Sequence, residues 1–211
     1  MTARIQQFRF LLLSLVISHI TGKSYDILYN DTLFAPLNMA SSLANFPVSE
    51  PLLSRSVVAD PPGAKLSIGW SYPHNSPTIS PGGILSTIND LAKLGLAILN
   101  SVLVSPIQTR AYIKPATHTA SLSYSVGVPW ETTQYIHPSS EKVTDVYTKV
   151  GDSGAYGGLL ALIPEYDDGF TLLNAYYETP VGPQIRGAWA LKILDHILEA
   201  LVPAPKAQAR A

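Results

Sequence analysis

Apolar and polar residues alternate with a period of two over most of the chain between residues 121 and 177. Successive side chains of a strand point to opposite faces of a sheet, so this period is typical of strands with one buried face. Asp168-Gly169, placed between two such runs, predicts a hairpin turn. The predicted strands are one or two around Gly127, and then 143–151, 158–163 and 169–177.

Helical spacing appears in the middle of the chain. Apolar residues recur every three or four positions over 88–98, and Thr87 with Asp90 three residues later forms a capping-box-like pair at the start. Ser105 before Pro106 has the order of an N-cap and an N1 proline, and it predicts a second, short helix.

A terminal helix is predicted after Pro183, where apolar residues recur every four positions. We expect these residues to form one buried stripe. They are Ile185, Trp189, Ile193, Ile197 and Leu201.

The N-terminus carries an apolar run over 10–17, preceded by two arginines. The run is too short to span a bilayer. It is compatible with a signal peptide, although His19, Ile20 and Lys23 stand where a cleavage site favours small residues. The alternative is a helix over 8–20, packed in the core and ended by Gly22, and we favour this helix. The choice between a secreted and a cytoplasmic location stays open.

A second helix is expected after Ser24, which can cap it, and Pro36 ends it. The long stretch from residue 39 to residue 81 shows little periodicity, apart from a possible short strand over 64–72.

Helices therefore come first, consecutive antiparallel strands follow, and a helix closes the chain. This order predicts an α+β fold in which an antiparallel sheet is flanked by helices. We expect one domain over residues 1–202 and a disordered tail over 203–211.

Composition narrows the function classes. The 211 residues are 46% apolar and 14% charged, which is typical of a globular protein with a sizeable core. The net charge of −1 gives no support to nucleic-acid binding. There is no cysteine, and the five histidines have no metal-ligand spacing, so we expect neither a metal site nor a cofactor.

One short stretch carries two competing motifs. Gly151-Asp152-Ser153-Gly154 is similar to the nucleophile loop of a chymotrypsin-like protease. That enzyme is all-β and needs a histidine base. The helical first half of this chain and the absence of a histidine in a matching context exclude this interpretation.

Four segments, taken in chain order, resemble the serine β-lactamase and penicillin-binding-protein superfamily, in its class C and DD-peptidase branch. "ITGKSYDILYNDTLFAPLNM" resembles a helix ending, a second helix and a closing loop of that family, with Asn38 in place of the usual glycine. "PGGILSTINDLAKLGLAIL" resembles the helix of that family with the pattern AGGL-x-STA-x-DLA-x-F. Residues 103–131 look like the fungal β-lactamase-like subgroup. Residues 146–175 resemble the Lys/His-Thr/Ser-Gly strand, glycine-rich turn and C-terminal hairpin.

The resemblance implies a site at Lys149, Val150 and Gly151. Lys149 would support a developing oxyanion or a substrate anion, and Gly151 would let substrate backbone lie against the strand. Val150 stands where the family has a hydroxyl residue. We expect Lys149 at a strand end facing a cleft and Gly151 in the following turn. The implied partner is a small-molecule acyl substrate.

The nucleophile motif of the family, Ser-x-x-Lys, is not found in its expected place. The one match, from Ser139 to Lys142, lies in a polar loop downstream and is interpreted as chance. Tyr-x-Asn is absent. The chain thus resembles the C-terminal part of such a domain, and we expect it to be inactive alone. Two hypotheses remain: an incomplete serine hydrolase or acyltransferase, or a non-catalytic ligand- or partner-binding remnant of that fold.

Overall fold

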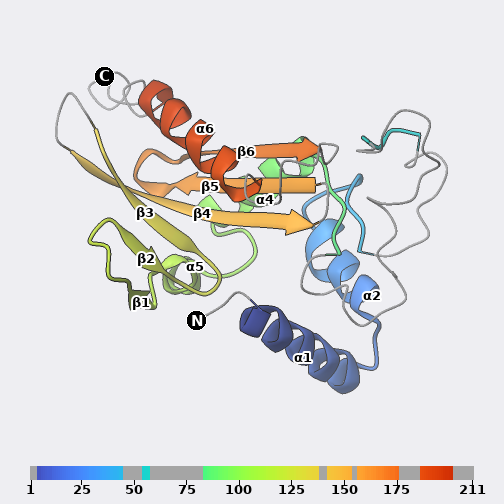
Figure 1. Cartoon of the computed structure of the whole chain (residues 1–211). Helices are drawn as coiled ribbons and strands as arrows, with labels where there is room; N and C mark the ends of the chain where they lie inside the picture. Colours follow the sequence, from blue (N-terminus) through green and yellow to red (C-terminus); the bar gives the residue numbers. More distant parts are fainter. Residues whose placement is uncertain are drawn as a thin grey trace. The chain divides into compact units, whose positions relative to one another are not determined.

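The computed structural model describes residues 4–44, 54–57, 83–137, 142–153, 156–175 and 186–201 (Figure 1). The chain divides into two compact units, described separately below. The first comprises residues 1–93, 152–156 and 174–177, and the second comprises 94–151, 157–173 and 178–211. The single domain over 1–202 stays a prediction. The expected strand over 64–72 and the tail over 203–211 lie outside the described residues.

Within the described residues, six strands form one antiparallel sheet, in which neighbours along the chain are neighbours in space (Figure 1). The α+β prediction, with helices flanking an antiparallel sheet, is confirmed. The strands are β1 (Thr117–His118), β2 (Tyr124–Val126), β3 (Glu131–Ile136), β4 (Val143–Ser153), β5 (Tyr156–Ile163) and β6 (Asp168–Ala175).

In the pair β3–β4 the register runs from Glu131 opposite Thr148 to Ile136 opposite Val143. β-Branched and aromatic residues make up most of both strands, and these residues suit a pleated surface. The Thr148 hydroxyl donates to the Glu131 carbonyl oxygen at 2.9 Å and so fixes the register.

The hairpin between β5 and β6 exists, but its turn was predicted at the wrong residues. Pro164–Tyr166 form a 3₁₀ turn, and Asp167 takes the left-handed conformation with φ 54°. Asp168 and Gly169 already belong to β6. Aspartate tolerates positive φ better than most residues, which lets Asp167 close the turn. Gly169 is free to approach the neighbouring strand, where a Cβ would lie 2.6 Å from the Ala161 carbonyl oxygen.

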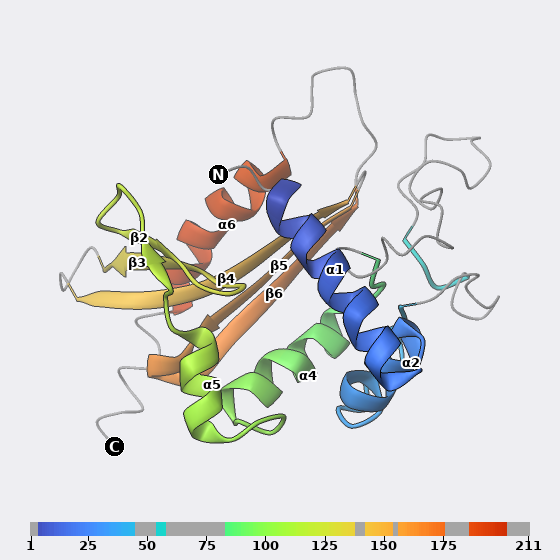
Figure 2. The same ribbon diagram turned by 90° about the horizontal axis from the view of Figure 1, so that it is seen from below.

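The core of the second unit lies between the sheet and the helix α6 (Arg186–Leu201). Figure 2 shows α6 on one side of β4–β6, with α5 (Pro106–Ile113) on the other. The buried cluster consists of Val146, Leu159, Ala161, Ile163, Leu194 and Leu198, each at most 2% exposed.

The predicted stripe of α6 was wrong at Ile193, and Ile185 lies outside the described residues. Leu194 and Leu198 face the core, whereas Ile193 is 37% exposed. A helix has 3.6 residues per turn. Residues that follow one another at a spacing of four are therefore each displaced by about 40° around the helix axis. Five such residues therefore cannot all face one surface.

Two predicted caps are present. The Ser105 hydroxyl accepts from the Gln108 backbone N–H at 3.4 Å, and the Gln108 side chain accepts from the Ser105 N–H at 3.1 Å, which makes a full capping box for α5. At the start of α4 (Ile88–Leu99), Thr87 Oγ1 accepts from the Asp90 N–H at 3.2 Å.

The first unit begins with α1 (Arg4–Thr21), which ends at Gly22 with φ +66°, as predicted. The helix α2 (Tyr25–Tyr29) follows Ser24 and continues as a π-helix, η1 (Asn30–Phe34), which ends before Pro36. The expectation that the N-terminal helix is packed in the core was wrong. Most of the large apolar side chains of α1 that the structure describes are exposed, because its small serines face inward.

Candidate functional site

Lys149 lies on β4, on the sheet face opposite the α6 core. Thr144, Val146 and Thr148 are buried, and alternate residues of a strand point to opposite faces. The Lys149 side chain is 44% exposed. Its Nζ donates to the Val150 carbonyl oxygen at 2.5 Å and lies 3.8 Å from Glu131 Oε1. The ammonium is therefore held by a short hydrogen bond to its own strand, while 44% of the side chain stays accessible to solvent.

Val150 and Gly151 offer different surfaces. The Val150 side chain packs against the buried cluster of the second unit, and its carbonyl oxygen accepts the hydrogen bond from Lys149 Nζ. Gly151 is exposed, and a Cβ built on it would meet no described atom within 4 Å. Internal packing thus gives no reason for a glycine here, and the backbone at this point is open to approach.

The position of Gly151 differs from the expectation. β4 continues to Ser153, so Gly151 lies within the strand and not in the following turn, and Lys149 stands four residues before the strand's last residue. The sheet resumes at Tyr156, as expected for the segment that leads to Gly158. Gly154 and the Pro81-Gly82 turn lie outside the described residues.

Two phenols on the strands β2 and β4 have raised pKa values. Burial raises the pKa of Tyr147, and the nearby Asp145 carboxylate adds to the shift. Burial also raises the pKa of Tyr124, with a contribution from the Glu131 carboxylate. Both phenols stay protonated at neutral pH and can donate hydrogen bonds. Neither Glu131 nor Tyr147 was singled out from the sequence, because neither belongs to a recognisable motif.

The lysine of the downstream Ser-x-x-Lys match is engaged elsewhere. Lys142 Nζ contacts Glu165 Oε1 and lies 3.3 Å from the Tyr166 hydroxyl and 5.1 Å from its ring centroid. The hydrogen bond to Glu165 is the main reason that the pKa of Lys142 is raised. A lysine held protonated by a carboxylate is unsuited to take a proton from a serine. Ser139 lies outside the described residues.

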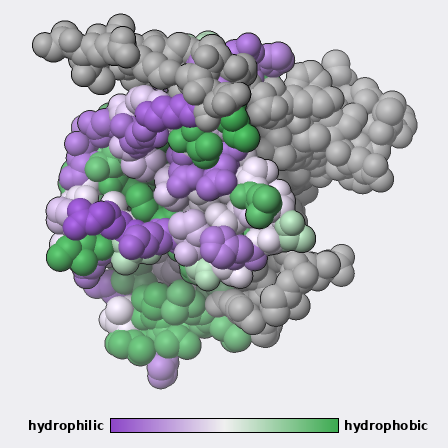
Figure 3. Space-filling view, turned by 90° about the vertical axis from the view of Figure 1, so that its left-hand side faces the viewer, coloured by the Kyte–Doolittle hydropathy of each residue, from purple (hydrophilic) through white to green (hydrophobic). Residues whose placement is uncertain are grey.

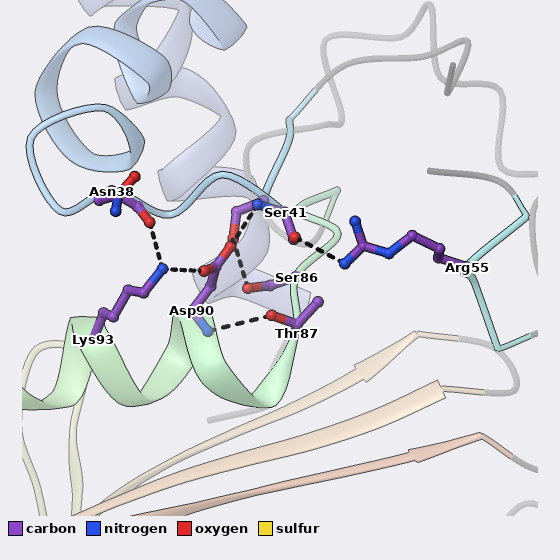
Figure 4. Close-up of polar contacts among 8 residues, drawn as sticks. Asn38, Ser41, Arg55, Ser86, Thr87, Asp90 and Lys93 are labelled. Atoms are coloured by element: carbon purple, nitrogen blue, oxygen red, sulfur yellow. Dashed lines mark hydrogen bonds and ion pairs between the residues drawn. The ribbon is translucent and has the colours of Figure 1, made fainter. Parts of the chain in front are cut away.

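A second polar cluster, centred on Asp90, lies within the first unit (Figure 4). The Asp90 residue is 3% exposed. Its carboxylate accepts from the Ser41 N–H at 2.8 Å, the Ser42 hydroxyl at 2.9 Å and Lys93 Nζ at 2.9 Å. Lys93 also donates to the carbonyl oxygen of Asn38, and Ser42 shares a hydrogen bond with Ser86 at 2.8 Å. The Asp90 cluster thus joins the loop after η1 to the start of α4.

Electrostatics favour a structural role for the Asp90 cluster. Burial alone would raise the pKa of Asp90, but the hydrogen bonds from Lys93, Ser41 and Ser42 outweigh it, and the pKa stays below its ordinary value. Such a carboxylate is a weak base and cannot activate Ser42 at neutral pH. Asn38 takes φ +52°. Asparagine tolerates positive φ better than most residues, which explains how it can replace the glycine that the family pattern has at this position.

The described residues hold no group of three or more side chains placed to bind a metal ion. Among their helices, none combines the length and apolar character needed to cross a membrane.

The antiparallel sheet flanked by helices has the β-lactamase and transpeptidase type of fold, of which it makes up a part. The chain belongs to the Beta-lactamase family, whose family model matches residues 7–190. The predicted resemblance is confirmed.

Known relatives agree with this membership. A "Beta-lactamase-like protein" of Arthroderma benhamiae is 32% identical over 208 residues, which are 97% of this chain and 32% of that protein. A D-amino acid amidase from Ochrobactrum anthropi superposes with a TM-score of 0.65 at 18% identity, over 94% of this chain and 58% of the amidase. A class C β-lactamase from Rhodobacter sphaeroides gives a TM-score of 0.65 at 18% identity, over 91% and 60%.

The matches cover nearly all of this chain but only part of each relative. Nearly all of this chain is matched, but it spans about a third of the curated relative and under two thirds of the solved structures. The remainder of those folds has no counterpart in the 211 residues.

Proposed function

We propose that this chain forms one wall of the acyl-transfer site of a β-lactamase-related serine hydrolase or acyltransferase, and that it is inactive alone. The observation that carries the proposal is the pairing of an accessible Lys149 with an open Gly151 backbone two residues later on the same strand. Family membership supplies the context for this pairing.

Lys149 would stabilise negative charge in this site. An ammonium near a developing oxyanion or a substrate carboxylate lowers the barrier to acyl transfer when it is in place before the reaction. To reach an anionic group, the exposed ammonium would exchange its hydrogen bond to the Val150 carbonyl oxygen for one to the substrate, and the 3.8 Å contact with Glu131 is a weak competitor. Gly151 would let the substrate backbone lie beside β4. The side chain of Val150 packs against the core, so its contribution would come from the main chain.

The nucleophile would come from outside these residues. The 211 residues contain one Ser-x-x-Lys, and its lysine is paired with Glu165. We therefore expect the purified chain to give no turnover with a chromogenic cephalosporin or a p-nitrophenyl ester. Turnover that Ser139→Ala abolishes would show that the downstream motif is a real nucleophile and would overturn this part of the proposal.

A fusion protein tests whether Lys149 belongs to an acyl-transfer site. The part of the Arthroderma relative that precedes its segment similar to this chain is joined to residue 1, and the product is treated with a fluorophosphonate or penicillin probe. We expect acylation, and we expect Lys149→Ala to slow it by roughly tenfold or more. Lys142→Ala is the matched control, because Lys142 precedes the same strand and is held by Glu165. A folded, acylated fusion indifferent to Lys149→Ala would refute the assignment.

The alternative is a non-catalytic remnant that binds a ligand or a partner. It is favoured by Val150, which removes the hydroxyl that the family pattern places beside the lysine. A fusion that folds and binds penicillin reversibly, with no covalent adduct, would favour this alternative.

A further inference from the structure

The helix α1 turns a polar face inward and its large apolar side chains outward, which reverses the usual arrangement of an amphipathic helix. Ser14 is buried at 4% exposure, and Leu11 and Ser18 are half-buried, so a face of mostly small polar residues points inward. These positions are three and four residues apart and share one face of the helix. The large apolar side chains that are exposed, each at 36–76%, are Phe10, Leu12, Leu13, Leu15, Val16, Ile17 and Ile20.

Between Phe10 and Ile20, the exposed side of α1 is apolar except for His19. Figure 3 shows one face of the molecule, on which apolar surface gathers at the lower end of the view. Soluble helices normally bury their apolar stripe and expose polar residues. Large exposed apolar patches mark surfaces that bind another partner.

The chemistry of this surface indicates a protein partner. Between Arg9 and Lys23 there is no residue of the Asp, Glu, Lys or Arg type. A helix that lies on a lipid surface has a strongly charged face opposite its apolar one, and α1 lacks this face between those residues. A helix surface with many exposed large apolar side chains is typical of a face that another protein segment covers.

The solved structures indicate which protein segment encloses it. They match over 90% of this chain, yet the chain accounts for only 58–60% of their length. Those folds therefore contain a large segment that these residues do not supply. We propose that the outward face of α1 is the docking surface for the polypeptide that forms the remainder of the β-lactamase fold. This inference rests on family membership and does not depend on the role of Lys149.

A two-chain capture experiment tests the docking surface. The part of the Arthroderma relative that precedes its similar segment is tagged and co-expressed with the full 211-residue chain as a separate polypeptide. We expect the two to co-purify in equal amounts, with the α1 amides exchanging more slowly in the complex than in the chain alone. The double variant Leu13→Gln, Val16→Gln should reduce capture by tenfold or more.

Two controls separate docking from misfolding. Leu122→Gln changes an apolar residue that is fully exposed between β1 and β2, and it should leave capture unchanged. The α1 double variant should keep its helical circular dichroism and should be more soluble alone than the original chain, because it removes exposed apolar surface.

Three results would overturn the proposal. In the first, the α1 variant captures the complement as well as the original chain does, or the original chain fails to capture it. In the second, the chain forms a homodimer that the α1 variant abolishes, and the face then binds a second copy. In the third, the chain binds vesicles of phosphatidylcholine and phosphatidylglycerol through α1 and ignores the complement, and the face then binds lipid.

Discussion

The helices α6 and α1 have similar lengths and apolar sequences, but they stand in opposite relations to the rest of the described chain. In the second unit, α6 buries Leu194 and Leu198 against the sheet at 2% and 1% exposure. In the first unit, α1 leaves Leu13 and Val16 each 52% exposed. An apolar pattern therefore indicates that a helix requires a partner surface, but it does not indicate that the same chain provides one.

The two units also differ in the contacts that hold them. The second unit has a cluster of six buried apolar residues between sheet and helix. In the first unit, the buried Asp90 carboxylate collects hydrogen bonds from the loop after η1 and from Lys93. We expect the second unit to be sensitive to cavity-forming substitutions and the first to be sensitive to acid.

The largest expected effect comes from truncating a leucine in each helix. Leu198→Ala should lower the free energy of unfolding by about 2–5 kcal/mol, because it leaves a cavity in a filled core. Leu13→Ala should change it by about 0.5 kcal/mol or less, because this side chain is already half exposed. Urea unfolding of the chain, or of the fusion if the chain aggregates, measures both.

Equal losses for the two leucines would contradict the comparison. They would mean that α1 is enclosed in solution, for example by self-association, which size-exclusion chromatography would detect.

Two glycines of the sheet give a smaller contrast. A Cβ on Gly169 would lie 2.6 Å from the Ala161 carbonyl oxygen, so Gly169→Ala forces two strands apart and should cost about 1–3 kcal/mol. Gly151→Ala meets open space and should leave stability within about 0.5 kcal/mol. In the fusion, Gly151→Ala should still slow acylation if substrate backbone lies against this position. A stable variant with unchanged acylation would remove Gly151 from the site.

The order and type of the elements could be predicted from the sequence, because each rests on local signals. The period-two segments became β2 to β6, and Ser105 with Pro106 became a capped helix start. The strand β1 was missed, since Thr117–His118 is too short to show a period. The α6 stripe was misplaced because a spacing of four was taken for one face, and the β5–β6 turn was misplaced because Asp167 closes it without glycine.

The site could be predicted only as far as its motif extends. Lys149 and Gly151 were named from the Lys-Val-Gly stretch. The length of β4 was not predicted, because nothing in the sequence marks the residue at which its pairing with the neighbouring strands ends. Glu131, whose carboxylate lies beside Lys149, comes from the neighbouring strand and becomes visible only with the β3–β4 register. Thr87 and Asp90 were paired as a local cap, and the tertiary role of the carboxylate was missed because Ser41 lies 49 residues away.

The smallest expected effect concerns acid and the Asp90 cluster. The pKa of Asp90 is lowered in the folded chain, so the unfolded chain binds more protons in the acid range and stability rises with pH there. The contribution is complete above the unfolded-state pKa of about 3.9 and is lost as the pH falls through the lower folded-state value. Asp90→Asn should cost about 1–2 kcal/mol at neutral pH, since partly exposed Lys93 is its charged partner, and this cost should shrink as the pH falls through the lowered folded-state pKa. Unfolding followed from pH 2 to 7 measures this difference. Asp31→Asn is the control, because Asp31 also has a lowered pKa, through Lys23, but the pair is exposed and should matter far less. An Asp90→Asn chain with the same acid dependence as the original would mean that the cluster does not hold the first unit.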